Sequence, residues 1–525
     1  METLIVGAGF SGLTTALELQ KLGIEDFLIV EKSERVGGTW ENNRYPGAEC
    51  DVPSLCYIPL EKSSKFIPST RFSGASEIQR FTEVIVDEHG LRNRIKLLTA
   101  LKASEWREAD CTWLVTLHDE NANKMWQIIC RYLVFGIGPL SLPRLPDISH
   151  PFQGLRVHSA DFPKDLNLEG KTVAVVGTGA SAIQVIPVIG KKVKKLYVFQ
   201  RTPSYVDDKP TEDFVPPPQL FGSAEQRNAF VNRKRREFDY WADELYLQFL
   251  SKPKVNAMEK EEWKKRLAAK VSDPILREKL TPSYPMGCKR LGYVNGYYET
   301  LQMPHVELIA EEVKAETPDG LVTSKGTRVQ GLDVIIYCTG FDAPYYFFEE
   351  MVNIKGKNGA LLKPSKTGYD SLYGIYIGNN FPNAFSLCGP QGFLVHVSST
   401  SLIDLQAEYI AKAIALARAN GFKRIVPKNE ACKQWTATCK ETGQKSMWTA
   451  CASWYNRGGN DFVGFAGKIS LYASFLTQDG FSKAEFSTNV NQPPKTFTSA
   501  EAPFDLLPEK QPPWPILQSM PHEDF

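Results

Sequence analysis

A glycine-rich segment close to the N-terminus constrains the fold of this chain more than any other feature. Residues 4–6 are a short apolar run, residues 7–12 read GAGFSG, and apolar residues then recur at helical spacing as far as Leu22. A second apolar run, residues 27–30, ends in Glu31. This order of strand, glycine turn, helix, strand and acid is the pattern of a Rossmann unit that binds a dinucleotide. We therefore predict such a unit at the start of the chain.

Each residue of this pattern has a mechanical reason. Gly7 permits the tight turn, Gly9 lets the backbone approach a pyrophosphate, and Gly12 lets the helix pack closely against the strand. The free amides at the helix N-terminus bind phosphate oxygens, and Glu31 can accept hydrogen bonds from a ribose. Because the chain has 38 glycines, the motif alone would be weak evidence, but the strands, helix and acid around it make the prediction specific.

A second unit of the same kind follows later in the chain. Residues 172–176 are apolar, residues 177–182 read GTGASA, and a second strand is expected at 196–199. That strand is followed by Arg201 rather than by an acid. A guanidinium can form a forked pair with phosphate oxygens, which suits the 2′-phosphate of NADP, whereas Glu31 would repel that phosphate. The two units are therefore predicted to bind different dinucleotides.

Length and composition indicate an ordinary globular protein. At 525 residues the chain is too long for one core, and about two to four domains are expected. The net charge of +1 gives no reason to expect nucleic acid or an anionic membrane as a partner. No apolar run has the length of a membrane span, and the first strand begins too early for a signal peptide. The ten cysteines include no CxxC pair, which is typical of reduced intracellular thiols, so we expect a cytoplasmic protein.

The remaining stretches have distinct patterns. Residues 36–54 are punctuated by glycine and proline, and such a long irregular segment is expected to carry function. Strands are predicted within 95–135 and at 334–340. A purely helical periodicity extends from about 205 to 285, and a further helix is predicted at 403–416.

The helical stretch has its own signals. Ser223 and Gln226 form a capping box. One apolar stripe follows it: Phe230, Phe238, Trp241, Leu245 and Phe249. The basic run at 233–236 is interpreted as a solvated helix face rather than as a localisation signal. From Asn489 onward the chain is Pro-rich without periodicity, and we predict no separate fold there.

Further motifs occur in a fixed order between residues 1 and 485. Residues 152–163 read FQGLRVHSADFP, which matches an FxGxxxHxxxW motif except that Phe162 replaces the tryptophan. The other motifs are Gly38-Thr39-Trp40, residues 43–47 (NRYPG), Cys50-Asp51, residues 200–202 (QRT), Lys289-Arg290 and residues 453–455 (SWY). With these motifs and its two glycine turns, the chain resembles the type I Baeyer–Villiger monooxygenases, class B flavin enzymes with two Rossmann domains. The departure at Phe162 concerns the packing between domains.

The resemblance implies an α/β fold with two Rossmann-like dinucleotide-binding domains, one for FAD and one for NADP, and a helical insertion. It implies an FAD-binding domain at 1–145 and 343–488, an NADP-binding domain at 146–204 and 286–342, the insertion at 205–285, and a Pro-rich tail at 489–525. The implied FAD contacts are Gly7, Gly9, Ser11, Gly12, Glu31, Gly38, Thr39, Trp40, Asp51, Tyr57 and Leu101. The implied NADP contacts are Glu49, Cys50, Asp51, Gly177, Thr178, Gly179, Ala180, Ser181, Ala182, Ile183, Arg201, Thr202 and Lys289, with Trp454 near the nicotinamide and the substrate.

The resemblance also implies a reaction. One oxygen atom of O₂ would be inserted next to a ketone carbonyl, at the expense of NADPH, to give an ester or lactone through a flavin C4a-peroxide. The peroxide and its tetrahedral adduct are anionic, so they need a fixed cation in a water-poor site. Arg290 suits this role because a guanidinium does not lose its proton, and Asp51 would hold its fork in place. The implied partners are a small ketone and O₂, and no oligomeric state is implied.

Two aromatic side chains and one loop allow more than one interpretation. We interpret His158 as a structural residue at the domain junction rather than as a general base. For Trp454, an ordinary core position and a substrate contact both stay open. Residues 389–396 (GPQGFLVH) depart from the small, Ser- and Pro-rich loop of the family, which favours a pocket shaped for an unusual ketone.

Other functions stay open at this point. A flavin disulfide reductase also pairs FAD with NADPH, and its redox cysteines would be Cys50 and Cys56, although their spacing is not the usual CxxxxC. Oxygenation or hydroxylation of a nitrogen or a sulfur occurs on the same fold and is a closer alternative. A non-catalytic protein that keeps the fold is disfavoured by the intact glycines and by Asp51 and Arg290.

Overall fold

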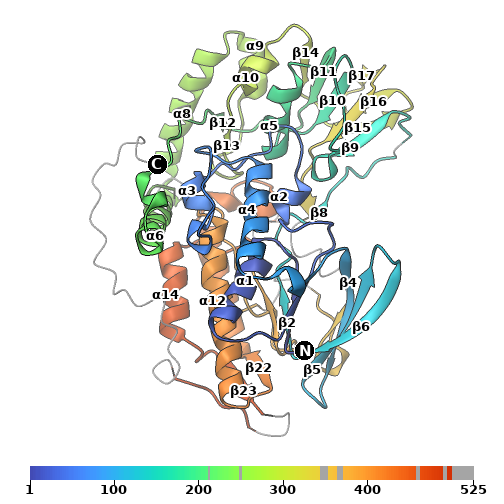
Figure 1. Ribbon diagram of the computed structural model, residues 1–525. Helices are drawn as coiled ribbons and strands as arrows, with labels where there is room; N and C mark the ends of the chain where they lie inside the picture. Colours follow the sequence, from blue (N-terminus) through green and yellow to red (C-terminus); the bar gives the residue numbers. More distant parts are fainter. Residues whose placement is uncertain are drawn as a thin grey trace.

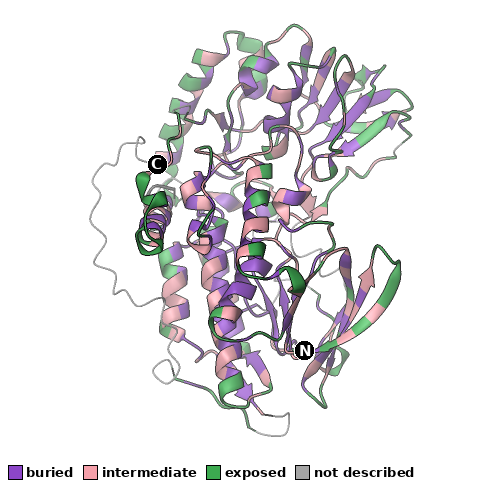
Figure 2. Cartoon of the chain, in the orientation of Figure 1, coloured by how far each residue is buried: buried purple, intermediate pink, exposed green. Residues whose placement is uncertain are grey.

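The computed structural model describes residues 1–149, 151–210, 213–246, 251–342, 353–363, 371–456, 462–488 and 493–498. Two five-stranded parallel sheets form the centres of two lobes, which lie at the bottom and the top of Figure 1. The strands of both sheets are largely buried, as Figure 2 shows. A parallel sheet needs cover on both faces, which explains why its strands are near-continuous apolar runs.

The first sheet is built on the N-terminal unit and has the order β21-β7-β1-β2-β3. Its strands are β1 Thr3–Val6, β2 Phe27–Val30, β3 Ile95–Lys96, β7 Tyr132–Phe135 and β21 Ala384–Ser386. Its principal helices are α1 Phe10–Lys21, α4 Ala75–Glu88 and α12 Ser399–Ala419. Helix α12 packs against α1, and it is longer at both ends than the predicted 403–416. The strand, turn, helix and strand predicted at the N-terminus are confirmed.

The second sheet repeats the arrangement with the order β14-β11-β10-β18-β9. Its strands are β9 Leu155–His158, β10 Thr172–Val176, β11 Lys195–Phe199, β14 Val306–Ile309 and β18 Val334–Tyr337. Helices α5 (Ala180–Ile189) and α10 (Tyr297–Leu301) contact each other beside it. The second glycine turn therefore lies between a strand and a helix, as predicted. The strand predicted at 334–340 is present as β18, which ends at Tyr337.

Smaller sheets complete the two lobes. The four-stranded sheet β20-β4-β5-β6 consists of β4 Thr99–Arg107, β5 Thr112–Asp119, β6 Lys124–Cys130 and β20 Asn353–Lys355. The others pair β8 Leu142–Pro143 with β19 Phe341–Asp342, β12 Val206–Asp207 with β13 Gly292–Tyr293, β15 Val313–Thr317 with β16 Gly320–Thr323 and β17 Arg328–Val329, and β22 Arg424–Pro427 with β23 Ala484–Ser487. The β-structure predicted within 95–135 is confirmed, and it includes β4, which the sequence pattern did not indicate.

The predicted helical insertion is helical only from about residue 218. It contains η4 Pro218–Phe221, α6 Ala224–Trp241, the π-helical turn η5 Ala242–Tyr246, α8 Pro253–Lys270 and α9 Pro274–Leu280. Both hydrogen bonds of the Ser223–Gln226 capping box are present. The start of the stretch is not helical: β12 pairs with β13, and prolines at 216–218, which lack an amide hydrogen, delay the first helix.

The prediction that the basic run at 233–236 is a solvated helix face is wrong for the side of α6 that faces the first lobe. Within the basic run, Arg235 is buried and forms ion pairs of 2.6 Å with both Glu61 and Asp404, so the run is not simply a solvated face. Of the apolar stripe, Phe230 is buried, and Phe238 and Trp241 pack partly buried against the main core. The Leu245 side chain and all of Phe249 lie outside the described residues.

The remaining helices and turns are short or close to the C-terminus. They are α2 Thr39–Asn42, α3 Ser54–Tyr57, α13 Asn429–Gln444, α14 Ile469–Asp479, η1 Leu60–Lys62, η2 Arg92–Arg94, η3 Ser159–Asp161, η7 Lys357–Gly359, η8 Met447–Thr449 and η9 Trp454–Asn456. In the described part of the tail, Phe497 packs into the main core and Lys495 pairs with Phe486, so that part joins the fold; residues 489–492 and 499–525 lie outside the described residues. Across the described ranges, no helix combines the length and apolarity that crossing a membrane requires.

Candidate active site

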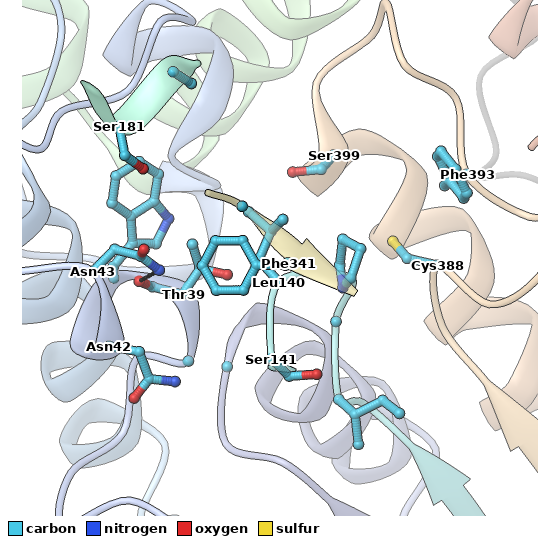
Figure 3. Close-up of a pocket in the computed structure, with 18 of the residues that line it drawn as sticks. Thr39, Asn42, Asn43, Leu140, Ser141, Ser181, Phe341, Cys388, Phe393 and Ser399 are labelled. Atoms are coloured by element: carbon cyan, nitrogen blue, oxygen red, sulfur yellow. Dashed lines mark hydrogen bonds between the residues drawn. The ribbon is translucent and has the colours of Figure 1, made fainter. Parts of the chain in front are cut away.

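One cavity of about 1050 Å³ joins the two glycine turns. In Figure 3, Thr39 and Asn43 lie on one side of it, Ser399 and Phe393 on the other, and Phe341 between them. Its volume is at the upper end of the range for small-ligand sites. The predicted site residues that line it are Gly7, Gly9, Ser11, Glu31, Gly38, Thr39, Trp40, Glu49, Cys50, Asp51, Tyr57, Leu101, Gly179, Ala180, Ser181, Ile183, Arg201, Lys289, Arg290 and Trp454. The structure thus brings residues of both units to one place.

The first glycine turn leaves no space for side chains. Gly7 has a φ of +104°, and a Cβ there would lie 2.6 Å from the carbonyl oxygen of Gly136. A Cβ on Gly12 would lie 1.9 Å from the carbonyl oxygen of Gly7, and one on Gly9 would lie 3.3 Å from the Cα of Gly38. The amides at the start of α1 therefore face the cavity over a bare backbone, which fits a pyrophosphate.

Glu31 directly follows β2 and is a buried carboxylate that lines this cavity. Its two oxygens accept hydrogen bonds from the amides of Ala8 (2.7 Å) and Ser33 (2.9 Å). These bonds tie the acid to the glycine turn and fix its orientation. A carboxylate has spare lone pairs for the hydroxyls of a ribose, so the first unit fits an FAD-type dinucleotide without a 2′-phosphate.

The segment at 36–54 contributes an aromatic corner. Trp40 donates a hydrogen bond of 2.9 Å from its indole to the hydroxyl of Tyr57, and the two rings meet edge to face. Burial raises the pKa of Tyr57, so the hydroxyl stays protonated. Thr39 and Asp51 of this irregular segment line the same cavity, which supports the expectation that the segment carries function.

The second turn is built alike but is more open. Gly177 has a φ of +112°, and a Cβ there would lie 2.5 Å from the carbonyl oxygen of Cys338, whereas a Cβ on Gly179 would meet no heavy atom within 4 Å. Five predicted contacts do not line the cavity: Gly12 of the first turn, and Gly177, Thr178, Ala182 and Thr202 of the second unit. Thr178 donates its hydroxyl to the carbonyl of Thr202.

Two cations lie together at the rim of the second turn. The side chain of Arg201 is 73% exposed and pairs with Glu312 at 3.4 Å. Lys289 is half-buried near it, over the ring of Tyr284. Burial and the positive charge of Arg201 lower the pKa of Lys289. Two neighbouring cations that repel each other are suited to share a multiply charged anion such as the 2′-phosphate of NADP.

Arg290 is held between the two units by a forked ion pair. Its Nε and Nη2 each donate to one oxygen of Asp51 at 2.8 Å, and its Nη1 donates to the carbonyl of Val395 at 3.1 Å. Although burial opposes ionisation of Asp51, the guanidinium holds the pKa of that carboxyl below its usual value. The arrangement is a fixed positive charge at the cavity wall, with 42% of the Arg290 side chain still exposed.

Contacts between the units include residues that the sequence did not indicate. Lys209, whose side chain is only 5% exposed, donates to the carboxylate of Glu49 (2.6 Å) and to the carbonyl of Cys50 (2.8 Å). Gln184 donates to the carbonyl of Glu49 and accepts from the hydroxyl of Tyr45. Lys209 follows no recognisable motif, so no sequence signal could have found it.

The far wall of the cavity is apolar. Phe393 and Trp454 stack with ring centroids 5.7 Å apart and an interplanar angle of 17°. Trp454 is 42% exposed, so it is not an ordinary core aromatic. Leu394 and Val395 line the same wall. The unusual loop noted in the sequence thus supplies an aromatic and aliphatic surface opposite the first unit.

The cysteines correct the expectation that all thiols are reduced. Cys288 and Cys451 form a disulfide that connects the segment before Arg290 to the segment before Trp454. The other eight cysteines are free and buried, Cys50 and Cys56 among them. Cys50 lines the cavity and Cys56 does not, so only one of the two thiols lies where the redox pair of a flavin disulfide reductase would need to be.

His158 and Phe162 lie away from the cavity wall. The Nδ1 of His158 accepts from the amide of Ala160, and its ring meets Phe341 edge to face. Burial lowers the pKa of His158, which keeps it neutral. Phe162 is buried in the core of the second lobe. This geometry agrees with a structural role for His158 beside the segment that connects the lobes.

Comparisons with known proteins identify the relatives. A family model described as NAD(P)-binding Rossmann-like domain matches residues 5–67, and one described as L-lysine 6-monooxygenase/L-ornithine 5-monooxygenase matches residues 91–211. A Baeyer–Villiger monooxygenase of Streptomyces coelicolor is 33% identical over 86% of this chain and 86% of its own length. The cyclohexanone 1,2-monooxygenase of an Acinetobacter species is 29% identical over 86% of this chain and 89% of its own length.

The solved structures agree with the curated relatives. The structure of OTEMO in complex with FAD and NADP covers 93% of this chain and 99% of its own, with a TM-score of 0.80 and 27% identity. The structure of cyclohexanone monooxygenase from Rhodococcus sp. Phi1 bound to NADP⁺ has the same coverage, a TM-score of 0.81 and 25% identity. The similarity therefore extends over both units and the insertion.

Proposed function

Because this chain belongs to the Baeyer–Villiger monooxygenase family, we propose that Arg290 and Asp51 are the residues on which its conversion of a ketone to an ester or lactone depends. The family makes the protein an FAD- and NADPH-dependent monooxygenase. The observation that carries the proposed roles is the forked Arg290–Asp51 pair at the wall of a cavity that joins both glycine turns.

The two units fit the two cofactors in different ways. When bound, FAD accepts two electrons from NADPH and activates O₂, so that one oxygen atom enters the ketone and the other leaves as water. The amides after Gly7 and Gly9 hold the FAD pyrophosphate and Glu31 holds its ribose. Arg201 and Lys289 hold the 2′-phosphate of NADPH. The bare backbone of the first turn and the paired cations at the second support these assignments.

Arg290 stabilises negative charge during oxygen transfer. As the carbonyl carbon of the ketone is attacked, charge develops on the carbonyl oxygen, and a fixed donor nearby lowers the free energy of that state. Asp51 accepts hydrogen bonds from two of the guanidinium nitrogens and so fixes the orientation of the positive charge. The guanidinium keeps that charge because it does not lose its proton. The wall formed by Phe393, Leu394 and Trp454 limits the water that would otherwise screen this charge.

Replacement of Arg290 by alanine tests the proposal. Loss of one preorganised oxyanion donor costs about 2.7–4 kcal/mol, or roughly a hundred- to a thousandfold in rate. We therefore expect R290A to consume NADPH slowly and to release hydrogen peroxide, while ester formation falls below detection. Arg290→Lys should not restore the product, because an ammonium cannot keep a forked contact with Asp51.

A second arginine supplies a matched control. Arg266 makes the same two-pronged contact with Asp207, at 3.0 and 2.9 Å, outside the cavity. R266A should keep the ratio of ester to NADPH that the wild type has. The measurement is product mass and NADPH consumption across a panel of ketones that includes cyclohexanone. Ester formation by R290A at close to the wild-type rate would refute the role of Arg290.

Amine oxygenation is the second candidate activity. The match to the lysine and ornithine monooxygenase model favours it, but that match covers residues 91–211 and includes neither Arg290 nor Trp454. A panel of ketones, amines and sulfides, analysed by product mass, separates the two activities. Faster turnover of amines than of any ketone would make the amine reaction the physiological one.

The domain limits derived from the sequence are part of the proposal. Strand β21 from the later stretch at 343–488 joins the first sheet, and β14 and β18 from 286–342 join the second. Both pairings support a chain that leaves each nucleotide domain and returns to it. Limited proteolysis should then cut within 205–285 before it cuts either sheet; early cleavage inside β1 or β10 would contradict this division.

We also propose a cytoplasmic location. The eight free thiols support a reducing compartment, while the Cys288–Cys451 disulfide is the observation against it. Cell fractionation combined with a thiol titration of the isolated protein decides the matter. Recovery of the protein from an oxidising compartment would overturn the assignment.

A further inference from the structure

The orientation of Arg290 depends on a contact outside its pair with Asp51. Nη1 of Arg290 donates to the carbonyl of Val395, which belongs to the irregular segment 387–398 between β21 and α12. A guanidinium held by two nitrogens on one carboxylate can still pivot about that contact, and the third bond restricts the pivot. Whatever fixes residue 395 therefore also fixes the charge of Arg290.

The next residue fixes this segment from behind. The side chain of His396 is fully buried and does not line the cavity, unlike its neighbours Val395 and Val397. Its Nε2 lies 3.2 Å from Oδ1 of Asp243, and because a carboxylate only accepts, Nε2 is the donor. The ring of Trp448 stacks against the imidazole at 5.8 Å. The imidazole is thus confined by a hydrogen bond and by an aromatic face.

Asp243 is itself anchored by a different part of the fold. It lies in the π-helical turn η5 at the end of α6, and its oxygens accept from the amide of Ile469 (2.9 Å) and the hydroxyl of Ser470 (3.1 Å) at the start of α14. A buried carboxylate at a helix N-terminus is stabilised there by the free amides. Interruptions of this π-helical kind are frequent at functional sites.

We propose that His396 and Asp243 form a positioning pair that sets the Val395 carbonyl and, through it, the guanidinium of Arg290. The pair connects the helical insertion, α14 and the cavity wall to the charge on which oxygen transfer depends. This inference rests on the proposed role of Arg290. Its consequence is that coupling, meaning ester formed per NADPH consumed, depends on residues that touch neither cofactor nor substrate.

The variant that tests the pair is His396→Leu. Leucine keeps an apolar side chain of similar reach for Trp448, and Asp243 keeps its contacts with Ile469 and Ser470. Misplacement of a reacting group by about 1 Å can cost roughly a hundredfold, so we expect coupling to fall by roughly tenfold or more. FAD content, the KM for NADPH and the rate of NADPH oxidation should stay within about threefold of wild type, because Arg201, Lys289 and both turns are untouched.

Two further variants make the result specific. H305L removes the hydrogen bond of a half-buried histidine to the Gly190 carbonyl, a contact whose residues do not line the cavity, and should leave coupling unchanged. D243N keeps the shape of the carboxylate and an acceptor for His396, and should lower coupling less than H396L does. If H396L does not fold, D243N alone must lower coupling at unchanged KM for NADPH.

A crystal structure of H396L supplies a readout that needs no activity. We expect the Nη1 of Arg290 to lie beyond hydrogen-bond distance of the Val395 carbonyl. Wild-type coupling in H396L, or an unchanged Arg290–Val395 contact, would overturn the inference while the proposed function stands. A wild-type protein that forms no ester from any ketone of the panel would instead refute the proposed function.

Discussion

The two nucleotide units of this chain use the same turn but enclose it differently. Gly7 and Gly177 have nearly the same φ, +104° and +112°, and in each a Cβ would strike a carbonyl oxygen of the neighbouring strand end. At the next glycine they diverge: a Cβ on Gly9 would contact Gly38, whereas one on Gly179 would meet nothing. The third position is Gly12 in the first unit and tolerates alanine, Ala182, in the second.

Glu31 and Arg201, which follow the second strand of their units, differ in exposure in the same way as the two turns. Glu31 is 6% exposed and is tied to two backbone amides, while the side chain of Arg201 is 73% exposed. A ligand of the first unit would be enclosed and slow to leave, and a ligand of the second could exchange with solvent. The same type of glycine turn can therefore bind either a cofactor that is retained or one that is consumed, depending on which residues pack against the turn.

The largest expected effect comes from exchanging the matched glycines for valine. Gly9→Val places carbons where Gly38 and the pyrophosphate lie, so we expect a folded but colourless protein without FAD. Gly179→Val has free space and should stay yellow, with weaker use of NADPH. FAD per polypeptide after gel filtration and the circular dichroism spectrum are the measurements. A G9V protein with full flavin content would break the comparison between the enclosed and the open turn.

The sequence predicted both turns because each is a local pattern of strand, glycines and helix. Spacing alone could not bring Asp51 to Arg290, since 239 residues separate them; only the resemblance to a family did so. The carbonyl of Val395 could not be found in this way, because a main-chain acceptor leaves no mark on residue type. The disulfide between residues 288 and 451 spans 163 positions and likewise depends on tertiary packing.

Mistaken predictions arose where tertiary contacts override local pattern. Arg235 belongs to a basic run that reads as solvated, yet it is buried because α6 presents it to Glu61 and Asp404. The start of the insertion was expected to be helical, but it forms a strand pair with residues 292–293 far along the chain. In both cases the partner lies far away in sequence, so propensity could not indicate it.

A smaller effect is expected from Arg201→Ala, which sharpens the comparison at the second unit. Loss of a charge-assisted hydrogen bond costs about 1.5–3 kcal/mol, so kcat/KM for NADPH should fall by about ten- to a hundredfold, towards the lower value because Arg201 is exposed. In R201A the kcat/KM for NADH, which lacks the 2′-phosphate, should change little. E312Q should leave the kcat/KM values for NADPH and NADH unchanged. Equal losses for NADPH and NADH would show that Arg201 is structural.

The smallest effect is a pH dependence carried by Lys289. Burial and the charge of Arg201 lower its pKa, so it loses its proton below 10.5, the ordinary lysine value. The 2′-phosphate needs the charged form; hence the KM for NADPH should rise a few-fold as pH increases through the lowered pKa. Lys289→Arg keeps its charge and should flatten this rise. The measurement is KM against pH for both proteins with NADPH and NADH. A rise that persists in K289R would place the titrating group elsewhere, and the open rim of the second unit would no longer explain it.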